Sequence, residues 1–305
     1  MYVNHFELNE FPFSLTPDTH YYFHKKANQD AMDFLEVCLA NGEGFVKIVG
    51  EIGTGKTVLC RKLLNSLSDR YVTAYIPNPY LAPAELKTML ADELSIEYDT
   101  QVNDKMLTSM IHQKLVDLAN DGKRLVVVID EAQAMPRETL EALRLISNFE
   151  TEKQKLLTIV LVGQPELDTI LARKELRQLR QRIVFSYYME PIKKQEIARY
   201  IYFRLEHAGY DKRNPFSLGA LKLLYYATGG VPRLINILCH KCLLIAYGEG
   251  ERSVNAGTML KAIMDSSENY VLGRRFVFLK RFRWPIVAGL SALSLVGLKL
   301  YWQVL

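Results

Sequence analysis

The segment from Gly50 to Thr57 reads Gly-Glu-Ile-Gly-Thr-Gly-Lys-Thr and fits the pattern G-x-x-x-x-G-K-[ST]. It follows an apolar run that predicts a strand and opens a predicted helix, which is the context this pattern requires. Glycines let the backbone curl so that successive N–H groups point at phosphate oxygens, and the helix start adds the positive end of its dipole. Lys56 is expected to face the β- and γ-phosphates, and Thr57 to place its hydroxyl on Mg²⁺. The segment therefore predicts a site for ATP and Mg²⁺, which is formed by Gly50, Glu51, Ile52, Gly53, Thr54, Gly55, Lys56, Thr57 and Val58.

Two carboxylates, Asp130 and Glu131, follow the apolar run Leu125–Ile129. Such a run, rich in β-branched residues, is typical of a strand that is buried on both faces of a parallel sheet. In an open α/β sheet, ligands bind at the carboxyl ends of the strands. Asp130 is therefore expected to reach Mg²⁺, directly or through a water, and Glu131 to polarise the attacking water. The alternative is an acidic pair on the surface at a strand end.

A neutral amide follows another apolar strand, since Gln164 comes shortly after Leu156–Val162. If this strand lies beside the other two, Gln164 faces the γ-phosphate and can orient the water. The alternative is a turn or helix-capping residue before Pro165.

Arginines gather just before the last predicted strand, at positions 173, 177, 180 and 182. One of them could be an arginine finger that reaches the nucleotide of a neighbouring subunit, and the alternative is a solvated basic helix face. Arg233 is placed more specifically. It follows two glycines and Pro232, which predict a fixed entry into a helix.

The fold class follows from the alternation of strands and helices, which predicts βαβ units and a doubly wound parallel sheet. The predicted strands are Phe45–Val49, Tyr71–Ile76, Leu125–Ile129, Leu156–Val162 and Ile183–Met189. The predicted helices are Ala27–Ala40, Val58–Leu67, Glu85–Leu94, Met106–Ala119 and Glu138–Phe149. From Pro191 to about Asp265 the pattern is helical, which predicts a small all-α domain of roughly four helices.

These patterns divide the chain into five parts. Residues 1–26 are predicted as a lead-in without periodicity, 27–191 as the α/β domain and 192–268 as the helical domain. Residues 269–283 are predicted as a basic linker, and 284–305 as a transmembrane or membrane-associated helix.

The charge distribution argues against nucleic-acid binding. The formal net charge is +4, but six cations and no acidic residue follow Glu268, so the residues up to Glu268 carry −2. Nucleic-acid binders usually spread their cations over a folded face. The cations between Glu268 and Trp284 also predict that the preceding body stays on the cytoplasmic side of a membrane.

Cysteine usage gives a weaker signal. Cys239 and Cys242 have a C-x-x-C spacing that could serve zinc or redox chemistry, but no second pair of ligands has a similar spacing. They lie in a predicted helix and are expected to pack in a core. The N-terminal residues contain no apolar stretch of the kind that predicts a signal peptide. We therefore expect the protein to stay in the cytoplasm with its cysteine thiols reduced.

Together these features resemble the AAA+ superfamily and, within it, the general secretion pathway protein A ATPases. The segments that carry the resemblance are Asn9–Pro17, the glycine-rich loop, Ile129–Gln133, Leu161–Leu167, Leu176–Ile183 and Gly230–Asn236. The resemblance places Gln164 at the sensor-1 position and Arg233 at sensor 2 in a helical lid domain. It makes Arg180 or Arg182 the finger, and it is strongest to the members that serve mannose-sensitive haemagglutinin (MSHA) pilus biogenesis.

The resemblance implies Mg²⁺-dependent ATP hydrolysis by a homo-oligomer at the cytoplasmic face of the bacterial inner membrane. Its partners would be assembly proteins of a type IV (MSHA-type) pilus or of type II secretion, and the C-terminal tail would contact the membrane. The alternative is a DNA-associated AAA+ ATPase of the transposition-regulator type, which shares these motifs. The near-neutral charge of the residues up to Glu268 and the apolar tail favour the first hypothesis.

Overall fold

The structure is a computed structural model that describes residues 2–16, 18–23, 26–99, 101–150 and 155–266. The chain divides into two compact units. The α/β unit comprises residues 16–191. Among the described residues, the helical unit comprises residues 2–15 together with 192–266.

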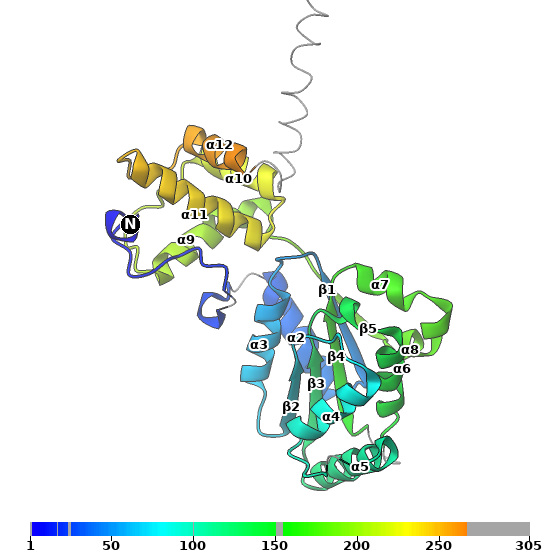
Figure 1. Cartoon of the computed structure of the whole chain (residues 1–305). Helices are drawn as coiled ribbons and strands as arrows, with labels where there is room; N and C mark the ends of the chain where they lie inside the picture. The colour runs from blue at the N-terminus through cyan, green and yellow to red at the C-terminus, as the bar shows by residue number, and fades with distance from the viewer. Residues whose placement is uncertain (1, 17, 24–25, 100, 151–154, 267–305) are drawn as a thin grey trace, which may run out of the picture. The chain divides into compact units, whose positions relative to one another are not determined.

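The α/β unit is built on a sheet of five parallel strands (Figure 1). The strands are β1 (Phe45–Gly50), β2 (Tyr71–Ile76), β3 (Arg124–Ile129), β4 (Leu157–Gly163) and β5 (Phe185–Met189). Their order across the sheet is β2-β3-β4-β1-β5, so β4 lies between the strand that precedes the glycine-rich loop and the strand that precedes Asp130. This is the doubly wound parallel sheet that the sequence predicted.

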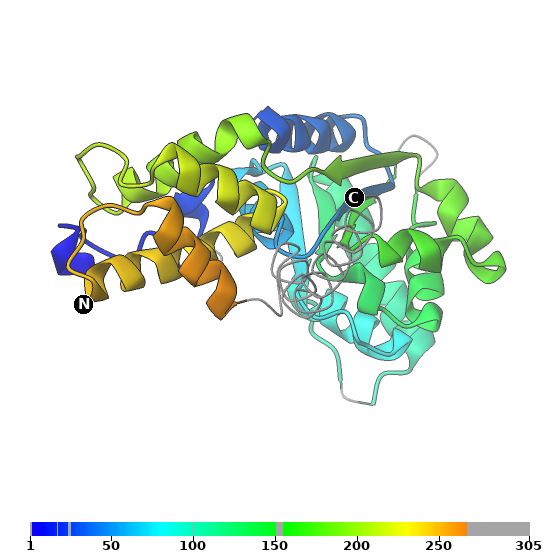
Figure 2. The same ribbon diagram turned by 90° about the horizontal axis from the view of Figure 1, so that it is seen from above.

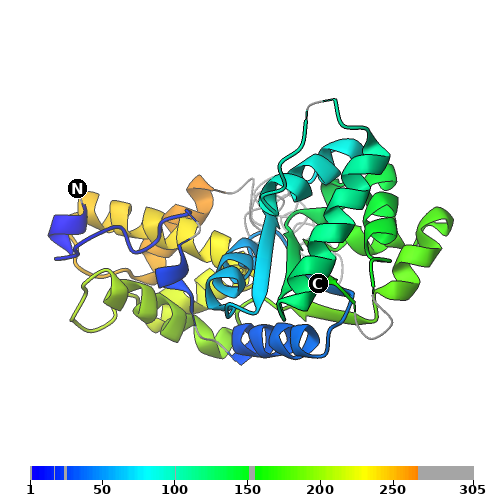
Figure 3. The same ribbon diagram turned by 90° about the horizontal axis from the view of Figure 1, so that it is seen from below.

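Helices cover both faces of the sheet (Figures 1 and 3). One face carries α2 (Lys26–Ala40) and α3 (Lys56–Ser66), and a short 3₁₀ turn at Thr19–Tyr21 precedes them. The other face carries α4 (Pro83–Glu93), α5 (Asp104–Asn120), α6 (Arg137–Ile146), α7 (Glu166–Leu171) and α8 (Arg177–Arg182), with 3₁₀ turns at Ala132–Ala134 and Lys174–Leu176.

The pattern of the central strands follows from this double cover. In β3, Val126 and Val128 pack among α2 and α3, whereas Val127 and Ile129 pack in the opposite core. Because both faces are dry, the buried positions of these strands are almost all apolar, and the exceptions in the described strands are Lys47 in β1 and Thr158 in β4. The edge strand β5 differs, since its residues alternate between half-buried and exposed up to Met189.

Two short helices, α7 and α8, were not predicted as elements. Each has six residues, which is less than two turns and too short to show a helical period. They place the arginine-rich segment on the surface before β5.

The helical unit contains α9 (Ile197–His207), α10 (Leu218–Thr228), α11 (Pro232–Gly248) and α12 (Ala256–Asp265), with a 3₁₀ turn at Lys194–Glu196 (Figure 2). The predicted helix entry is confirmed, because Gly229 ends α10 at φ +60° and Pro232 begins α11. Between them, Gly230 has φ +82°, and a Cβ there would lie 2.0 Å from the carbonyl oxygen of Ile192. Only glycine fits this close approach.

The lead-in does not stand apart as a segment of 1–26, because its first part packs in the helical unit (Figure 3). The short helix α1 (Tyr2–His5) lies against α11, and the Tyr2 hydroxyl is 2.9 Å from His240 Nδ1. The buried Arg204 donates through Nε to the Pro12 carbonyl oxygen at 2.6 Å. The sequence pattern could not show this, because the partners are about 190 residues apart along the chain.

The cysteines behave as predicted core residues. Cys239 and Cys242 are free and buried on α11, and burial raises the pKa of both thiols. No group of three or more histidine, cysteine or acidic side chains that could hold a metal occurs in the described part of the chain.

The predicted basic linker and apolar tail, residues 269–305, lie outside the described residues. Among the helices of the described ranges, none combines the length and the apolar character needed to cross a bilayer.

Candidate functional site

The glycine-rich loop joins β1 to α3 in the way that the sequence predicted. β1 ends at Gly50 and α3 begins at Lys56, with Gly53 at φ +81° and Gly55 at φ +101° between them. A Cβ on Gly50 would lie 2.8 Å from Thr54 Oγ1, so this position has no room for a side chain. The loop backbone is therefore free to curl around a phosphate.

The Lys56 ammonium lies inside this loop. Its Nζ donates to the carbonyl oxygens of Gly50 at 2.7 Å and Glu51 at 3.0 Å, and the residue is 5% exposed. Burial lowers the pKa of Lys56, and the carboxylates of Glu131 and Asp130 oppose this change. Two loop carbonyls are weak partners for a buried charge compared with a phosphate, so the position suits an anion-binding lysine.

Thr57 and Asp130, which the sequence assigned to Mg²⁺, are brought together from two elements. Thr57 Oγ1 on α3 donates to Asp130 Oδ2 beyond β3 at 2.6 Å. Asp130 is 3% exposed, and its second oxygen accepts the Glu131 N–H at 2.9 Å. A hydroxyl and a buried carboxylate beside a phosphate loop form the oxygen donor set that Mg²⁺ prefers, so these residues fit the ion.

Glu131 turns away from Asp130 because its backbone is left-handed, with φ +51°. Few residues other than glycine adopt this conformation, and it separates the directions of the two carboxylates. Glu131 Oε2 accepts hydrogen bonds from Gln164 Nε2 at 2.9 Å and from Gln133 Nε2 at 2.5 Å. Gln164 is thus beside the acidic pair, as the strand order requires.

Gln133 is a residue of this site to which the sequence analysis gave no role. Besides its bond to Glu131, its Oε1 accepts the backbone N–H of Gln164 at 3.0 Å. A Cβ on Gly163 would lie 2.9 Å from that same oxygen, so the glycine leaves space for the amide. The sequence did contain a signal for this role, since Gln133 lies two residues after Glu131, at the end of the segment Ile129–Gln133 that carries part of the family resemblance.

The pKa of Glu131 is set by opposing effects. Partial burial raises it, but the hydrogen bonds from Gln164 and Gln133 and the charge of Lys56 outweigh burial and leave the pKa below its ordinary value. Donors to an ionised carboxylate stabilise that form. Glu131 is therefore held ionised, as a base must be.

The other residues of the glycine-rich loop differ in their exposure to solvent. Glu51 and Ile52 are exposed, Thr54 is buried, and Val58 is half-buried on α3. Thr54 Oγ1 donates to the Glu51 carbonyl oxygen at 2.9 Å, which fixes the loop from within.

Arg180 and Arg182, in the α/β unit, lie outside this cluster. Arg182 donates to the Arg144 carbonyl oxygen at 3.1 Å and to Ser147 Oγ at 2.7 Å, at the end of α6. Arg180 is exposed on α8, and Arg233 is exposed in the first turn of α11 in the helical unit. The finger role expected of Arg180 or Arg182 therefore depends on contacts beyond this cluster.

Comparison with known proteins agrees with the fold and the loop. An AAA domain family matches residues 40–171. General secretion pathway protein A of Aeromonas hydrophila is 39% identical over 267 residues, which cover 88% of this chain and 49% of that protein. The chain therefore spans about half the length of this curated relative.

Among solved structures, Cdc6p of Pyrobaculum aerophilum matches 84% of the chain and 70% of its own, with a TM-score of 0.64 at 18% identity. A Walker-type ATPase of Pyrococcus abyssi matches 88% of the chain and 80% of its own, with a TM-score of 0.59 at 18% identity. At such identities the likeness concerns the fold alone. Residues 40–171 thus match an AAA domain, and the chain is similar over most of its length to general secretion pathway protein A, as the resemblance in its sequence predicted.

Proposed function

We propose that this chain binds ATP with Mg²⁺ and hydrolyses it. The observation that carries the proposal is the hydrogen bond of 2.6 Å between Thr57 and Asp130, beside the buried Lys56. It joins the start of the helix after the loop to the end of β3. A purely structural loop has no need of a buried lysine and a buried carboxylate at the same edge of a sheet.

Each residue then has a definite task. The loop backbone and Lys56 bind the phosphates, while Thr57 and Asp130 hold Mg²⁺. When bound, Mg²⁺ neutralises charge on the β- and γ-phosphates. Glu131 accepts a proton from the attacking water, and Gln164 orients that water.

Gln133 is proposed as a positioning residue. It fixes Glu131 on one side and the backbone of Gln164 on the other, so the base and the water-orienting amide move as one group. A base must lie within hydrogen-bond reach of its proton to act.

The arginine finger is proposed to act on a neighbouring subunit. α8 enters the sheet at the amino end of β5, whereas the loop lies at the carboxyl end of β1, which pairs with β5 in parallel. Five strand residues separate these edges by roughly 15 Å. We assign the finger to Arg180, because the Arg182 side chain is already bonded to α6.

The helical unit is proposed to serve as the lid, with Arg233 as sensor 2. Arg233 lies next to Pro232 at the start of α11, where the fixed φ of proline and the tight fit of Gly230 hold the helix entry.

For the cellular role, we propose assembly work at the cytoplasmic face of the inner membrane, in type IV (MSHA-type) pilus biogenesis or type II secretion. The support is the relationship to general secretion pathway protein A and the basic and apolar residues of the tail. The partners would be pilus or secretion assembly proteins and further copies of this chain.

Two substitutions separate binding from hydrolysis. Lys56→Ala removes the charge that faces the phosphates and should weaken ATP binding at least about 10-fold. Glu131→Gln keeps the shape but not the basicity, so it should retain ATP binding and lower turnover about 10²-fold or more. Fluorescent-nucleotide titration and phosphate release measure the two effects, and Lys62→Ala on the same helix is the control. Unchanged ATP affinity in a folded Lys56→Ala protein would refute the loop assignment.

Gln133→Ala should lower kcat about 10-fold with little change in the KM for ATP, because Gln133 positions the base without touching the phosphates. It also removes a donor that lowers the pKa of Glu131, so that pKa rises and the acid limb of the pH–rate profile moves to higher pH. Gln113→Ala, which removes an exposed amide on α5, is the matched control. An unmoved acid limb would show that Gln133 has a packing role only.

Arg180→Ala should leave ATP affinity nearly unchanged and lower turnover about 10³-fold, whereas Arg177→Ala on the same helix should not. Turnover per subunit should rise with protein concentration, since a monomer lacks the finger. Mixing Arg180→Ala with Glu131→Gln should restore activity, because some interfaces then combine an intact base with an intact finger. The trans mechanism is wrong if turnover is independent of concentration and no mixture recovers.

A variant that stops after Glu268 should still bind ATP, because the loop and the acidic pair lie far earlier in the chain. The full chain should float with lipid vesicles in a density gradient, and the shortened variant should remain at the bottom. Equal partitioning of the two proteins would contradict the membrane role of the tail.

A further inference from the structure

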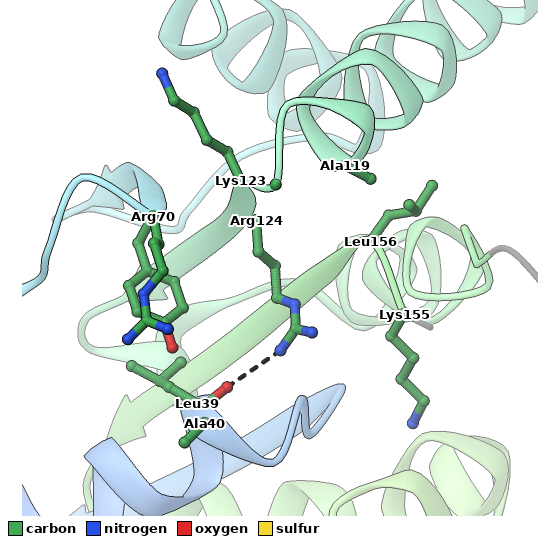
Figure 4. Close-up of a pocket in the computed structure, with 10 residues that line it drawn as sticks. Leu39, Ala40, Arg70, Ala119, Lys123, Arg124, Lys155 and Leu156 are labelled. Carbon is green, nitrogen blue, oxygen red and sulfur yellow. Dashed lines mark hydrogen bonds between the residues drawn. The ribbon is translucent and has the colours of Figure 1, made fainter. Parts of the chain in front are cut away.

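A hollow of about 220 Å³ lies in the α/β unit at the edge of the sheet opposite the glycine-rich loop (Figure 4). It is formed where β2, β3 and β4 begin and where α2 and α5 end. The six residues of β1 separate the two edges by about 20 Å. The hollow is therefore distinct from the ATP site.

Four cations line this hollow, and no acidic residue is among its described lining. Arg70 directly precedes β2, Lys123 and Arg124 lie at the start of β3, and Lys155 lies just before β4. Because neighbouring strands are about 4.8 Å apart, residues at the starts of three adjacent strands converge on one small region. Asp69, Asp121 and Glu43 lie close to the lining in sequence, but among the described residues none of them forms an ion pair with a lining cation. Glu150 pairs with Lys155 through the backbone and lines a neighbouring hollow.

The carboxyl ends of the neighbouring helices account for only part of this positive charge. The carbonyls at the end of a helix attract cations, and Arg124 donates to the Leu39 carbonyl oxygen at the end of α2 at 3.1 Å. A guanidinium has five N–H donors, and this is the one hydrogen bond that the Arg124 side chain forms with a described residue. The side chains of Arg70, Lys123 and Lys155 form no hydrogen bond or ion pair with any described residue.

Two glycines make room for the cations. A Cβ on Gly42 would lie 2.8 Å from Arg124 Nη1, and a Cβ on Gly44 would lie 3.0 Å from both Cδ and Nζ of Lys155. In Figure 4, Arg70, Arg124 and Lys155 extend toward the side on which Leu39 and Ala40 lie, whereas Lys123 extends the other way. Three of the four cationic side chains thus extend to one side of the hollow. Gly42 and Gly44, on either side of Glu43, leave room for two of them.

We propose that this hollow binds a small phosphate-bearing anion. Forked arginine donors match the oxygens of phosphate, and lysines add point charges. Several positive charges without acidic partners favour a multivalent anion over a single carboxylate. The volume suits a small group such as a pyrophosphate or a phosphorylated headgroup, and not a long duplex.

The test is calorimetric titration of the full-length protein with inorganic pyrophosphate, in the Lys56→Ala background that disables the glycine-rich loop. Arg70→Gln with Lys155→Gln should weaken binding at least about 10-fold. Lys105→Gln with Arg137→Gln, which removes one lysine and one arginine elsewhere on the same unit, should not change it. Equal pyrophosphate affinity in the two double variants would overturn the proposal, as would the absence of pyrophosphate binding to the Lys56→Ala parent.

A variant that keeps every charge guards against an effect on folding. Gly44→Ala should push the flexible Lys155 side chain aside and weaken pyrophosphate binding, while circular dichroism and melting temperature stay close to those of the parent. A parallel titration with glycerol 3-phosphate identifies the source, because tighter binding than pyrophosphate indicates a lipid headgroup and weaker binding a free phosphate ligand. If a polyglutamate peptide displaces both probes at lower concentration than either binds, the site is not a phosphate site.

Discussion

The parallel register of β1, β4 and β3 is the constraint on which the site depends. Val49 lies opposite Gly163, and Ile129 lies opposite Leu161, so the three strands end at nearly the same level. Gly50, Asp130 and Gln164 each follow within two residues of these ends. A register slip would turn alternate side chains to the opposite face and separate the acidic pair from the loop. A slip would move each apolar side chain into the core on the other face, where the closely packed neighbours fit a different side chain.

Much of the site at the carboxyl edge of the sheet could be predicted, because the sequence patterns that indicate it are local. A loop pattern between a strand and a helix, and an apolar run that ends in two carboxylates, need only neighbouring residues to be recognised. The condition placed on Gln164, that its strand lie beside the other two, is met by the order β3-β4-β1. The role of Gln133 could not be predicted, because it comes from hydrogen bonds to Glu131 and to the backbone of Gln164. No rule based on residue spacing describes those hydrogen bonds.

The features that could not be predicted depend on contacts between distant parts of the chain. Arg204 binds the Pro12 carbonyl, and this draws the start of the chain into the helical unit instead of a separate lead-in. The cations of Arg70, Arg124 and Lys155 are far apart in sequence, and only the common start of parallel strands gathers them. The sheet thus has two chemically different edges, with carboxylates and the glycine-rich loop at one and, at the other, cations that form no ion pair with a described residue.

A structure of the protein with Mg²⁺ and a non-hydrolysable ATP analogue tests the central claim most directly. The phosphates should lie inside the loop, with Lys56 Nζ moved from the Gly50 and Glu51 carbonyls to phosphate oxygens. Mg²⁺ should lie between Thr57 and Asp130 in place of their direct hydrogen bond, and Glu131 within reach of a water beside the γ-phosphate. A nucleotide bound elsewhere, or a Thr57–Asp130 hydrogen bond that persists beside a bound nucleotide, would contradict the account.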